Sequence, residues 1–168
     1  MAQLLNLGSD EYSENLSPWE IELRRRAWWT LCCLEKRCAE DAASRPASIM
    51  DMSNCSLPLN VNDDDLDPAA FTSPIVRSGI TDMTFCLMRF EMLRLFLDIF
   101  GTKPDATIVD LTQRQISLNF RKETVLGITR VRLDKDCLRY CNNSRPFDWF
   151  IRTFTEGFLV SINFTPKL

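Results

Sequence analysis

The chain has 168 residues, of which 45% are hydrophobic and 26% charged; this is the balance of a folded globular domain and excludes general disorder. With a formal net charge of −3, the chain lacks the basic excess of a free-standing nucleic-acid-binding domain. Histidine is absent, which excludes every catalytic triad, general base and metal site built on that residue.

The seven cysteines do not form the pattern of a secreted disulfide framework, because their number is odd and Cys32 and Cys33 are adjacent. We expect them to be small apolar side chains in a reducing compartment. Cys137 and Cys141 lie four residues apart, but two thiols do not complete a structural zinc site. Cys32, Cys33 and Cys38 share one predicted helix and cannot surround a single ion. The sequence therefore predicts no metal site.

The first predicted helix spans about 18–43 and has a clear start signal. Ser17 is placed as the N-cap residue, Pro18 occupies the first helical position, and Glu20 completes a capping box. Seven apolar residues then recur at spacings of three and four, which predicts one buried stripe widened by Trp28. The stripe consists of Trp19, Leu23, Ala27, Leu31, Leu34, Cys38 and Ala42.

An arginine run, 24–26, lies in the first half of this helix. Glu20 precedes Arg24, and Glu22 precedes Arg26, by four residues, which is the favourable order for helical ion pairs. We therefore expect the run to form a paired helix surface. A phosphate-binding site is the alternative.

Pro46 ends the helix region, and 47–79 is predicted to be a long ordered loop, whose length suggests a functional or family-specific segment. Its acidic part, 60–67, invites a test for calcium binding. An EF-hand loop counted from Asn60 would need glycine at the sixth position and glutamate at the twelfth, where Asp65 and Phe71 stand. We therefore predict a turn-and-cap segment without an ion.

A second helix is predicted over 81–100, with Thr81 as its cap and Gly101 after its end. Its long apolar stretch, 83–100, contains four charged residues, which argues against a membrane-spanning helix. It is apolar on two sides, as expected for a helix packed between neighbours. One side holds Phe85, Met88, Met92, Leu95 and Ile99; the other holds Met83, Leu87, Phe90 and Leu97.

A third helix is predicted over about 119–140, because Leu126, Leu133 and Tyr140 recur every seven residues with Cys137 beside them. A turn follows at 142–144. A fourth helix then starts near Pro146, with four phenylalanines on one side: Phe147, Phe150, Phe154 and Phe158. No useful strand alternation appears. The predicted fold class is all-α, an irregular helical array with a long ordered loop between the first and second long helices.

The sequence contains none of the common catalytic motifs. There is no phosphate-binding glycine loop, no dinucleotide-binding glycine pattern and no nucleophile elbow. A nucleophilic cysteine would need a base or an environment that lowers its pKa, and no histidine supplies the first. We therefore predict no enzyme activity, no catalytic or cofactor-binding residues and no cofactor.

Several motifs, in order and spacing, resemble one family. They begin with SPWEIELRRRAWW (17–29) and continue with LEKR (34–37), AED (39–41), LPLNVNDDDL (57–66), TDMTF (81–85) and the region 138–149. Together they resemble the regulatory, or middle homology, domain of fungal binuclear-zinc-cluster transcription factors, also called the xylanolytic activator regulatory domain. The resemblance covers about 1–152, and 153–168 diverges.

The resemblance implies an all-helical, nuclear domain that regulates RNA polymerase II transcription. Family members usually carry an N-terminal six-cysteine zinc cluster that binds DNA, and this chain has none, so DNA and zinc are associations of the family only. Its earlier regulatory helices are missing too, and 1–7 resembles the end of one. The histidine common after that helix is replaced around Gly8 and Ser9. We expect a partial domain over 1–168.

Four hypotheses follow. In the first, the chain acts through a protein partner, such as a full-length related transcription factor, without binding nucleic acid or membrane itself. In the second, it is a small-molecule-sensing helical module. In the third, it is a non-functional truncated product whose exposed phenylalanines promote aggregation. The fourth is an enzyme, which the missing motifs disfavour.

Overall fold

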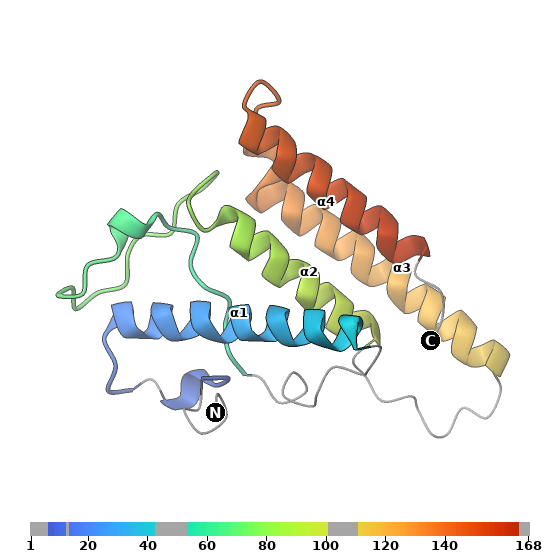
Figure 1. Cartoon of the computed structure of the whole chain (residues 1–168), viewed down its shortest axis with the longest axis horizontal. Coiled ribbons are helices and arrows are strands. Elements are labelled where there is room, and N and C mark those ends of the chain that lie inside the picture. The colour runs from blue at the N-terminus through green and yellow to red at the C-terminus, as the bar shows by residue number, and fades with distance from the viewer. Residues whose placement is uncertain (1–6, 13, 43–53, 101–110, 165–168) are drawn as a thin grey trace. The chain divides into compact units, whose positions relative to one another are not determined.

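The computed structural model describes residues 7–12, 14–42, 54–100 and 111–164 (Figure 1). The described residues contain four α-helices, three short 3-10 turns and no strand, apart from an isolated bridge between Ser9 and Asn54. The prediction of an all-α fold is confirmed. In chain order the elements are η1 (Asp10–Tyr12), α1 (Pro18–Asp41), η3 (Asp63–Asp65), α2 (Thr84–Phe100), α3 (Leu111–Asp136), η4 (Leu138–Tyr140) and α4 (Pro146–Phe164).

The chain divides into two compact units. The first comprises residues 1–77 and 81–90, and the second comprises 78–80 and 91–168. The start of α2 belongs to the first unit and its remainder to the second. No described helix is long and apolar enough to cross a membrane.

The start of α1 is the predicted capping box. The backbone N–H of Glu20 donates to Ser17 Oγ at 3.2 Å, and the N–H of Ser17 donates to Glu20 Oε2 at 2.8 Å. Pro18 stands at the first helical position. Local chemistry therefore fixes where the helix begins, and its end at Asp41 lies close to the predicted boundary.

The predicted buried stripe of α1 is wrong for most of its residues, because only Trp19 is half-buried and Trp28 buried, and the others are exposed. Leu23, Leu31 and Leu34 are 39%, 43% and 53% exposed. Ala27 and Cys38 are exposed as well. The buried side, which we call the inner face, consists of Glu22, Trp28, Trp29, Cys32 and Ala39.

Two tryptophans anchor this inner face. Trp29 Nε1 donates to the Ser56 carbonyl at 2.9 Å, and its ring lies 5.9 Å from that of Phe90. Gly8 lies directly against Trp28, where a Cβ atom would come within 2.8 Å of the indole ring. No larger residue fits at position 8 without displacing Trp28. The segment before α1 is therefore packed on the same face as the loop after it.

The described part of the interhelical loop is ordered without regular structure except for η3. The α2 helix starts at Thr84, three residues later than predicted, because Thr81–Met83 forms a turn. The backbone N–H of Thr81 donates to Thr84 Oγ1 at 2.7 Å, and that of Met83 donates to Thr81 Oγ1 at 3.2 Å. Thr81 thus caps the turn, as predicted, although the helix begins later. Buried residues of α2 occur on both predicted sides, namely Met88, Met92, Leu95 and Ile99 on one and Phe90 on the other, and Met83 is buried in the turn before the helix.

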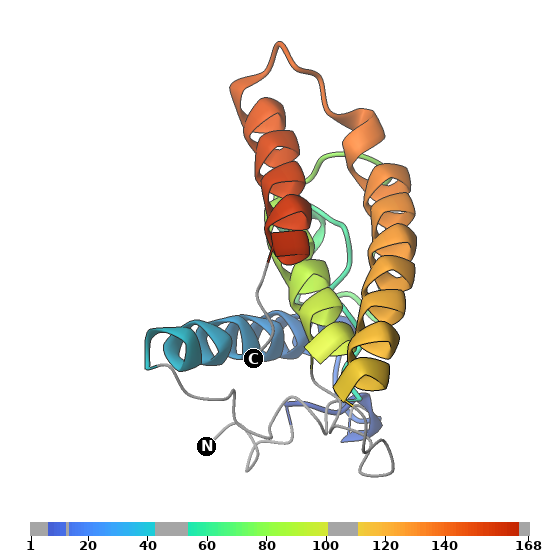
Figure 2. The same ribbon diagram turned by 90° about the vertical axis from the view of Figure 1, so that its right-hand side faces the viewer.

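In the second unit, α3 and α4 form a helical hairpin (Figure 2). Its core joins the end of α2 to both helices. The buried centre consists of Leu95, Ile99, Leu159 and Ile162, with Leu118, Val125, Leu126 and Phe158 packed against it.

The predicted limits of α3 are also wrong. The helix covers Leu111–Asp136, and η4 follows it as a separate turn. Helical geometry ends at Cys137, whose φ and ψ are −138° and −62°. Leu133 and Cys137 are buried as expected, but Tyr140 is 44% exposed. The Tyr140 ring lies against Gly79, where φ is +98° and only glycine is unstrained.

The α4 helix starts at Pro146, as predicted, but its phenylalanine side is not the buried one. Phe147, Phe150 and Phe154 are 49%, 41% and 37% exposed, while Phe158 packs against the core. The buried stripe instead consists of Asp148, Ile151, Thr155, Leu159 and Ile162. At its start, Asp148 accepts the backbone N–H of Asn142 at 2.8 Å, which fixes the predicted turn before the helix.

Candidate functional site

A buried carboxylate lies at the centre of the inner face of α1. The side chain of Glu22 is 1% exposed. Its two oxygens accept the backbone N–H of Leu59 at 3.2 and 3.1 Å, and Oε1 also accepts from Arg26 Nε at 2.9 Å. A buried carboxylate persists only where charged and neutral donors satisfy it. Glu22 therefore attaches the loop to the helix by hydrogen bonds that a hydrophobic residue could not make.

Of the two predicted ion pairs, Glu22 with Arg26 is present, whereas Glu20 accepts hydrogen bonds from Ser17. Arg25 binds Asp10 through two hydrogen bonds, of 3.1 and 2.9 Å, and Asp10 also accepts the backbone N–H of Ser56 at 3.1 Å. Burial alone would raise the pKa of Asp10, but these hydrogen bonds hold the pKa below its ordinary value. Arg26 pairs with Glu22 and, at 2.6 Å, with Asp63. Carboxylates of this chain therefore pair with both arginines, although Nη2 of Arg26 is buried without a hydrogen-bond partner among the described residues.

The acidic loop divides its carboxylates among separate partners. Asp63 pairs with Arg26, and Asp65 forms two hydrogen bonds with Arg77 and accepts the N–H of Asn62 at 2.9 Å. Hydrogen bonding from Arg77 lowers the pKa of Asp65. The described residues contain no group of three or more acidic or cysteine side chains that could hold a metal ion. This part of the chain forms turns and attachments, as the sequence predicts.

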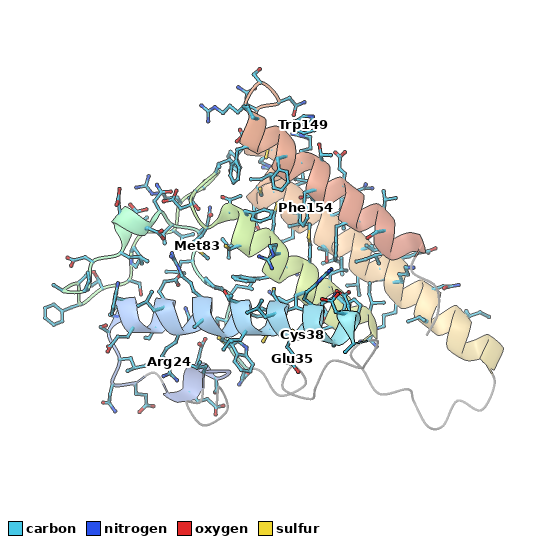
Figure 3. The ribbon with its side chains drawn as sticks, viewed as in Figure 1. Arg24, Glu35, Cys38, Met83, Trp149 and Phe154 are labelled. Carbon is cyan, nitrogen blue, oxygen red and sulfur yellow. The ribbon has the colours of Figure 1, made fainter. Side chains whose placement is uncertain are left out.

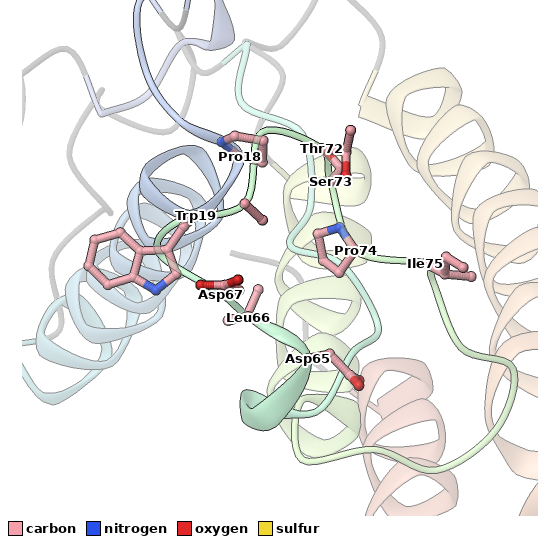
Figure 4. Close-up of a pocket in the computed structure, with 10 residues that line it drawn as sticks. Pro18, Trp19, Asp65, Leu66, Asp67, Thr72, Ser73, Pro74 and Ile75 are labelled. Atoms are coloured by element: carbon pink, nitrogen blue, oxygen red, sulfur yellow. The ribbon is translucent and has the colours of Figure 1, made fainter.

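A small hollow lies beside this loop (Figure 4). The first two residues of α1, Pro18 and Trp19, form one wall of it, and the segments 65–67 and 72–75 with Ala70 form the rest. Its volume is about 250 Å³, slightly below the size of ordinary ligand pockets. Asp65 and Asp67, its two acidic residues, already bind Arg77 and the N–H of Ala69. The hollow offers no unused charged group to orient a small molecule.

Five of the seven cysteines have a raised pKa, which disfavours the thiolate form. All seven are free thiols in the structure. Burial raises the pKa of Cys32, Cys55 and Cys137 to about 12, and burial also raises the pKa of Cys33 and Cys141. A thiol with a raised pKa is a poor nucleophile at neutral pH.

The surface that sequence reasoning missed lies on the opposite side of α1. We call it the outer stripe of α1, and it consists of Leu23, Ala27, Leu31, Leu34 and Cys38. Figure 3 marks Cys38 near the C-terminal end of the helix, where this stripe ends. Its spacing is that of a helix face that packs against another helix. The signal was present in the sequence, but it was assigned to the core of this chain.

The comparisons with known proteins agree with the sequence motifs. The family described as the fungal specific transcription factor domain matches residues 1–123. Transcriptional regulator AacuB of Aspergillus aculeatus is 33% identical over 92 residues, which is 55% of this chain and 12% of the relative. The aurofusarin cluster transcription factor aurR2 of Gibberella zeae is 36% identical over 93 residues, 55% of this chain and 14% of the relative.

A third relative extends the similarity slightly further. The pyriculol/pyriculariol biosynthesis cluster transcription factor 1 of Pyricularia oryzae is 31% identical over 105 residues, 62% of this chain and 14% of the relative. The chain thus spans only a small part of these relatives. No solved structure matches it. The predicted extension of the family domain to residue 152 stays a prediction.

Proposed function

The chain belongs to the fungal specific transcription factor domain family, and from this premise we propose that it regulates RNA polymerase II transcription in the nucleus through protein contacts. Its partner in this proposal is a longer member of the same family. That partner would contribute the DNA-binding zinc cluster, and this chain would contribute a helical docking surface.

The outer stripe of α1 is the observation that carries the proposal. Its three leucines are each more than a third exposed on a helix whose other side is well packed. Burying a leucine side chain in an interface is favourable by about 1.5–3 kcal/mol relative to full exposure. The curated relatives contain several times more chain than the stretch matched here. We propose that a helix from such a longer chain covers the outer stripe.

The charge distribution supports protein rather than nucleic acid as the partner. The net charge is −3, and Arg25 and Arg26 are directed to Asp10, Glu22 and Asp63. A DNA-contacting face would need basic side chains available for phosphates. The apolar outer stripe has instead the character of a helix–helix contact.

A binding experiment tests the proposal. The purified chain is titrated with the full-length AacuB protein and, separately, with full-length aurR2, and the dissociation constant is measured by calorimetry. The proposal predicts binding that the double variant Leu31→Glu/Leu34→Glu weakens at least roughly tenfold. Phe71→Glu is the matched control, because Phe71 is 98% exposed but lies in the loop.

Absence of binding to either relative, or binding that the outer-stripe variant leaves unchanged, would count against the proposed partner. A fluorescent fusion expressed in a filamentous fungus tests the nuclear location separately. Because two of the relatives are named for biosynthesis clusters, transcripts of such clusters are the first to measure when the chain is deleted or overexpressed.

A further inference from the structure

The second unit carries a second exposed apolar surface, on α3. We call it the α3 stripe, and it extends over four turns of the helix. Its large members are unusually exposed: Ile116 is 63%, Phe120 71%, Ile128 55% and Val131 70% exposed. At 1.5 Å per residue the stripe is about 22 Å long. A surface of this length and character is typical of a helix–helix contact rather than of isolated surface residues.

The residues in the middle of the α3 stripe have small side chains. Thr124 and Gly127 lie between its large residues, and a Cβ atom at Gly127 would have no other atom within 4 Å. The Thr124 hydroxyl donates to the Phe120 carbonyl at 2.9 Å, so it needs no further hydrogen-bond partner. Glycine lowers the stability of an isolated helix. Its use here, where no described atom lies within 4 Å of the Cβ position, leaves room for a close approach by a helix from outside.

Charges border one edge of the stripe. Glu123 and Arg130 are both exposed and lie seven residues apart, so they project from the same side of the helix. In an antiparallel pair of identical helices, residues on the same edge of the two copies face each other. A crossing centred near residues 125 and 126 places Glu123 of each copy within about two residues, or 3 Å along the axis, of the level of Arg130 of the other. The charges on this edge of one copy are therefore opposite to those that they face on the second copy.

We propose that the α3 stripe binds the α3 stripe of a second copy of this chain, in antiparallel orientation and with twofold symmetry. In that arrangement Phe120 of one copy lies opposite Val131 of the other. Thr124 lies opposite Gly127, so the helices approach closely where the side chains are small. The same patch serves both copies, as a twofold interface requires.

This inference does not rest on the proposed function. The stripe extends beyond residue 123, where the family match ends, and it belongs to a different unit from the outer stripe of α1. A single pair of helices buries less surface than most permanent dimers, so the expected dimer forms in the micromolar range or above.

Sedimentation equilibrium of the full chain in reducing buffer, from low micromolar to several hundred micromolar concentrations, is the first measurement. We expect a reversible monomer–dimer equilibrium. Gly127→Leu should raise the dissociation constant roughly tenfold or more, because the leucine separates the helices at their crossing. The monomer should keep its fold, since leucine is the better helix former and its Cβ atom meets no other atom within 4 Å.

Gly157→Leu is the matched control. Gly157 is another exposed glycine inside a long helix, α4, and a Cβ atom there also has no other atom within 4 Å. It should leave the dissociation constant within about twofold of wild type. Equal weakening by both variants would overturn the assignment to α3, and so would a chain that stays monomeric at every concentration.

A charge exchange tests the antiparallel orientation. Glu123→Arg alone and Arg130→Glu alone should each weaken the dimer, because each places like charges at both ends of the contact. The double variant restores opposite charges and should recover most of the wild-type affinity. A double variant as weak as the worse single one would contradict the antiparallel pairing.

Discussion

The two sides of α1 use different chemistry. The inner face packs tryptophans and a buried glutamate against the loop. Trp29 donates to the Ser56 carbonyl, and Glu22 accepts the Leu59 N–H. The outer stripe consists of apolar side chains, and its leucines are each more than a third exposed. The comparison teaches that the more regularly hydrophobic side of a helix is not always the side that its own chain covers.

The inner face owes its burial to hydrogen bonding as much as to apolar area. A segment without regular structure has backbone N–H and C=O groups that need partners once they are buried. Glu22 accepts the Leu59 N–H and Trp29 donates to the Ser56 carbonyl, while Asp10 of η1 accepts the Ser56 N–H. An aliphatic stripe has no such groups, so it suits another helix, whose backbone is already satisfied.

Among the substitutions proposed here, loss of the Glu22 carboxylate should lower the stability of the chain most. Glu22→Ala leaves the Leu59 N–H without its acceptor and removes the buried partner of Arg26. We expect the free energy of unfolding to fall by about 3 kcal/mol, measured by urea denaturation. Glu22→Gln keeps one acceptor and should cost less. If both variants unfold within error of wild type, the inner face is not attached as described.

The attachment of η1 should give the next largest effect, and it should depend on pH. Asp10→Asn weakens the contacts to Arg25 and Ser56, for an expected loss of about 1–2 kcal/mol at neutral pH. The pKa of Asp10 is lower in the folded chain than in the unfolded one. Its contribution is therefore complete above its ordinary pKa and is lost as the pH falls through the folded value.

The stability difference between wild type and Asp10→Asn should accordingly shrink below about pH 4. Denaturation curves at a series of acidic pH values give this difference directly. A difference that grows on acidification would show that the Asp10 carboxylate is not stabilised in the folded chain.

The Ser17 cap stabilises the start of α1 rather than either of its faces. Its loss should therefore lower the stability less than loss of Glu22 or Asp10. Ser17→Ala removes the acceptor of the Glu20 N–H, for an expected loss of about 1 kcal/mol in thermal or urea unfolding. Ser17→Asp keeps an acceptor at the same position and should restore most of that loss. Equal destabilisation by both variants would argue against the capping box.

The outer stripe should be nearly silent in the isolated chain. Leu34 is 53% exposed, so Leu34→Gln should change the free energy of unfolding by no more than about 0.5 kcal/mol. The loss of stability expected for Glu22→Ala is several times larger, although both residues lie in the same helix. A loss above about 2 kcal/mol in the same urea experiment would mean that this chain itself buries the stripe.

Local rules predicted the helix starts well. The capping box of α1 and the position of Pro146 in α4 depend on a few adjacent residues, which a sequence displays directly. The start of α3 was predicted eight residues too late, because 111–118 lacks the apolar repeat on which that prediction depended. The family, too, could be recognised from motifs in the first half of the chain.

The faces could not be predicted, because burial depends on partners distant in sequence. A helical repeat of leucines predicts a face that packs against something. It does not show whether the packing partner belongs to the same chain. Glu22 looked like one half of a surface ion pair, and only the position of Leu59, 37 residues later, shows why it is buried.

Amide hydrogen exchange in the 54–66 segment tests most directly the central claim that the inner face of α1 holds this loop. We predict that the N–H groups of Ser56 and Leu59 exchange slowly although they lie outside any helix or strand, and that Glu22→Ala releases the Leu59 amide. Exchange of both amides at the rate of an unstructured peptide in the wild-type chain would contradict the claim.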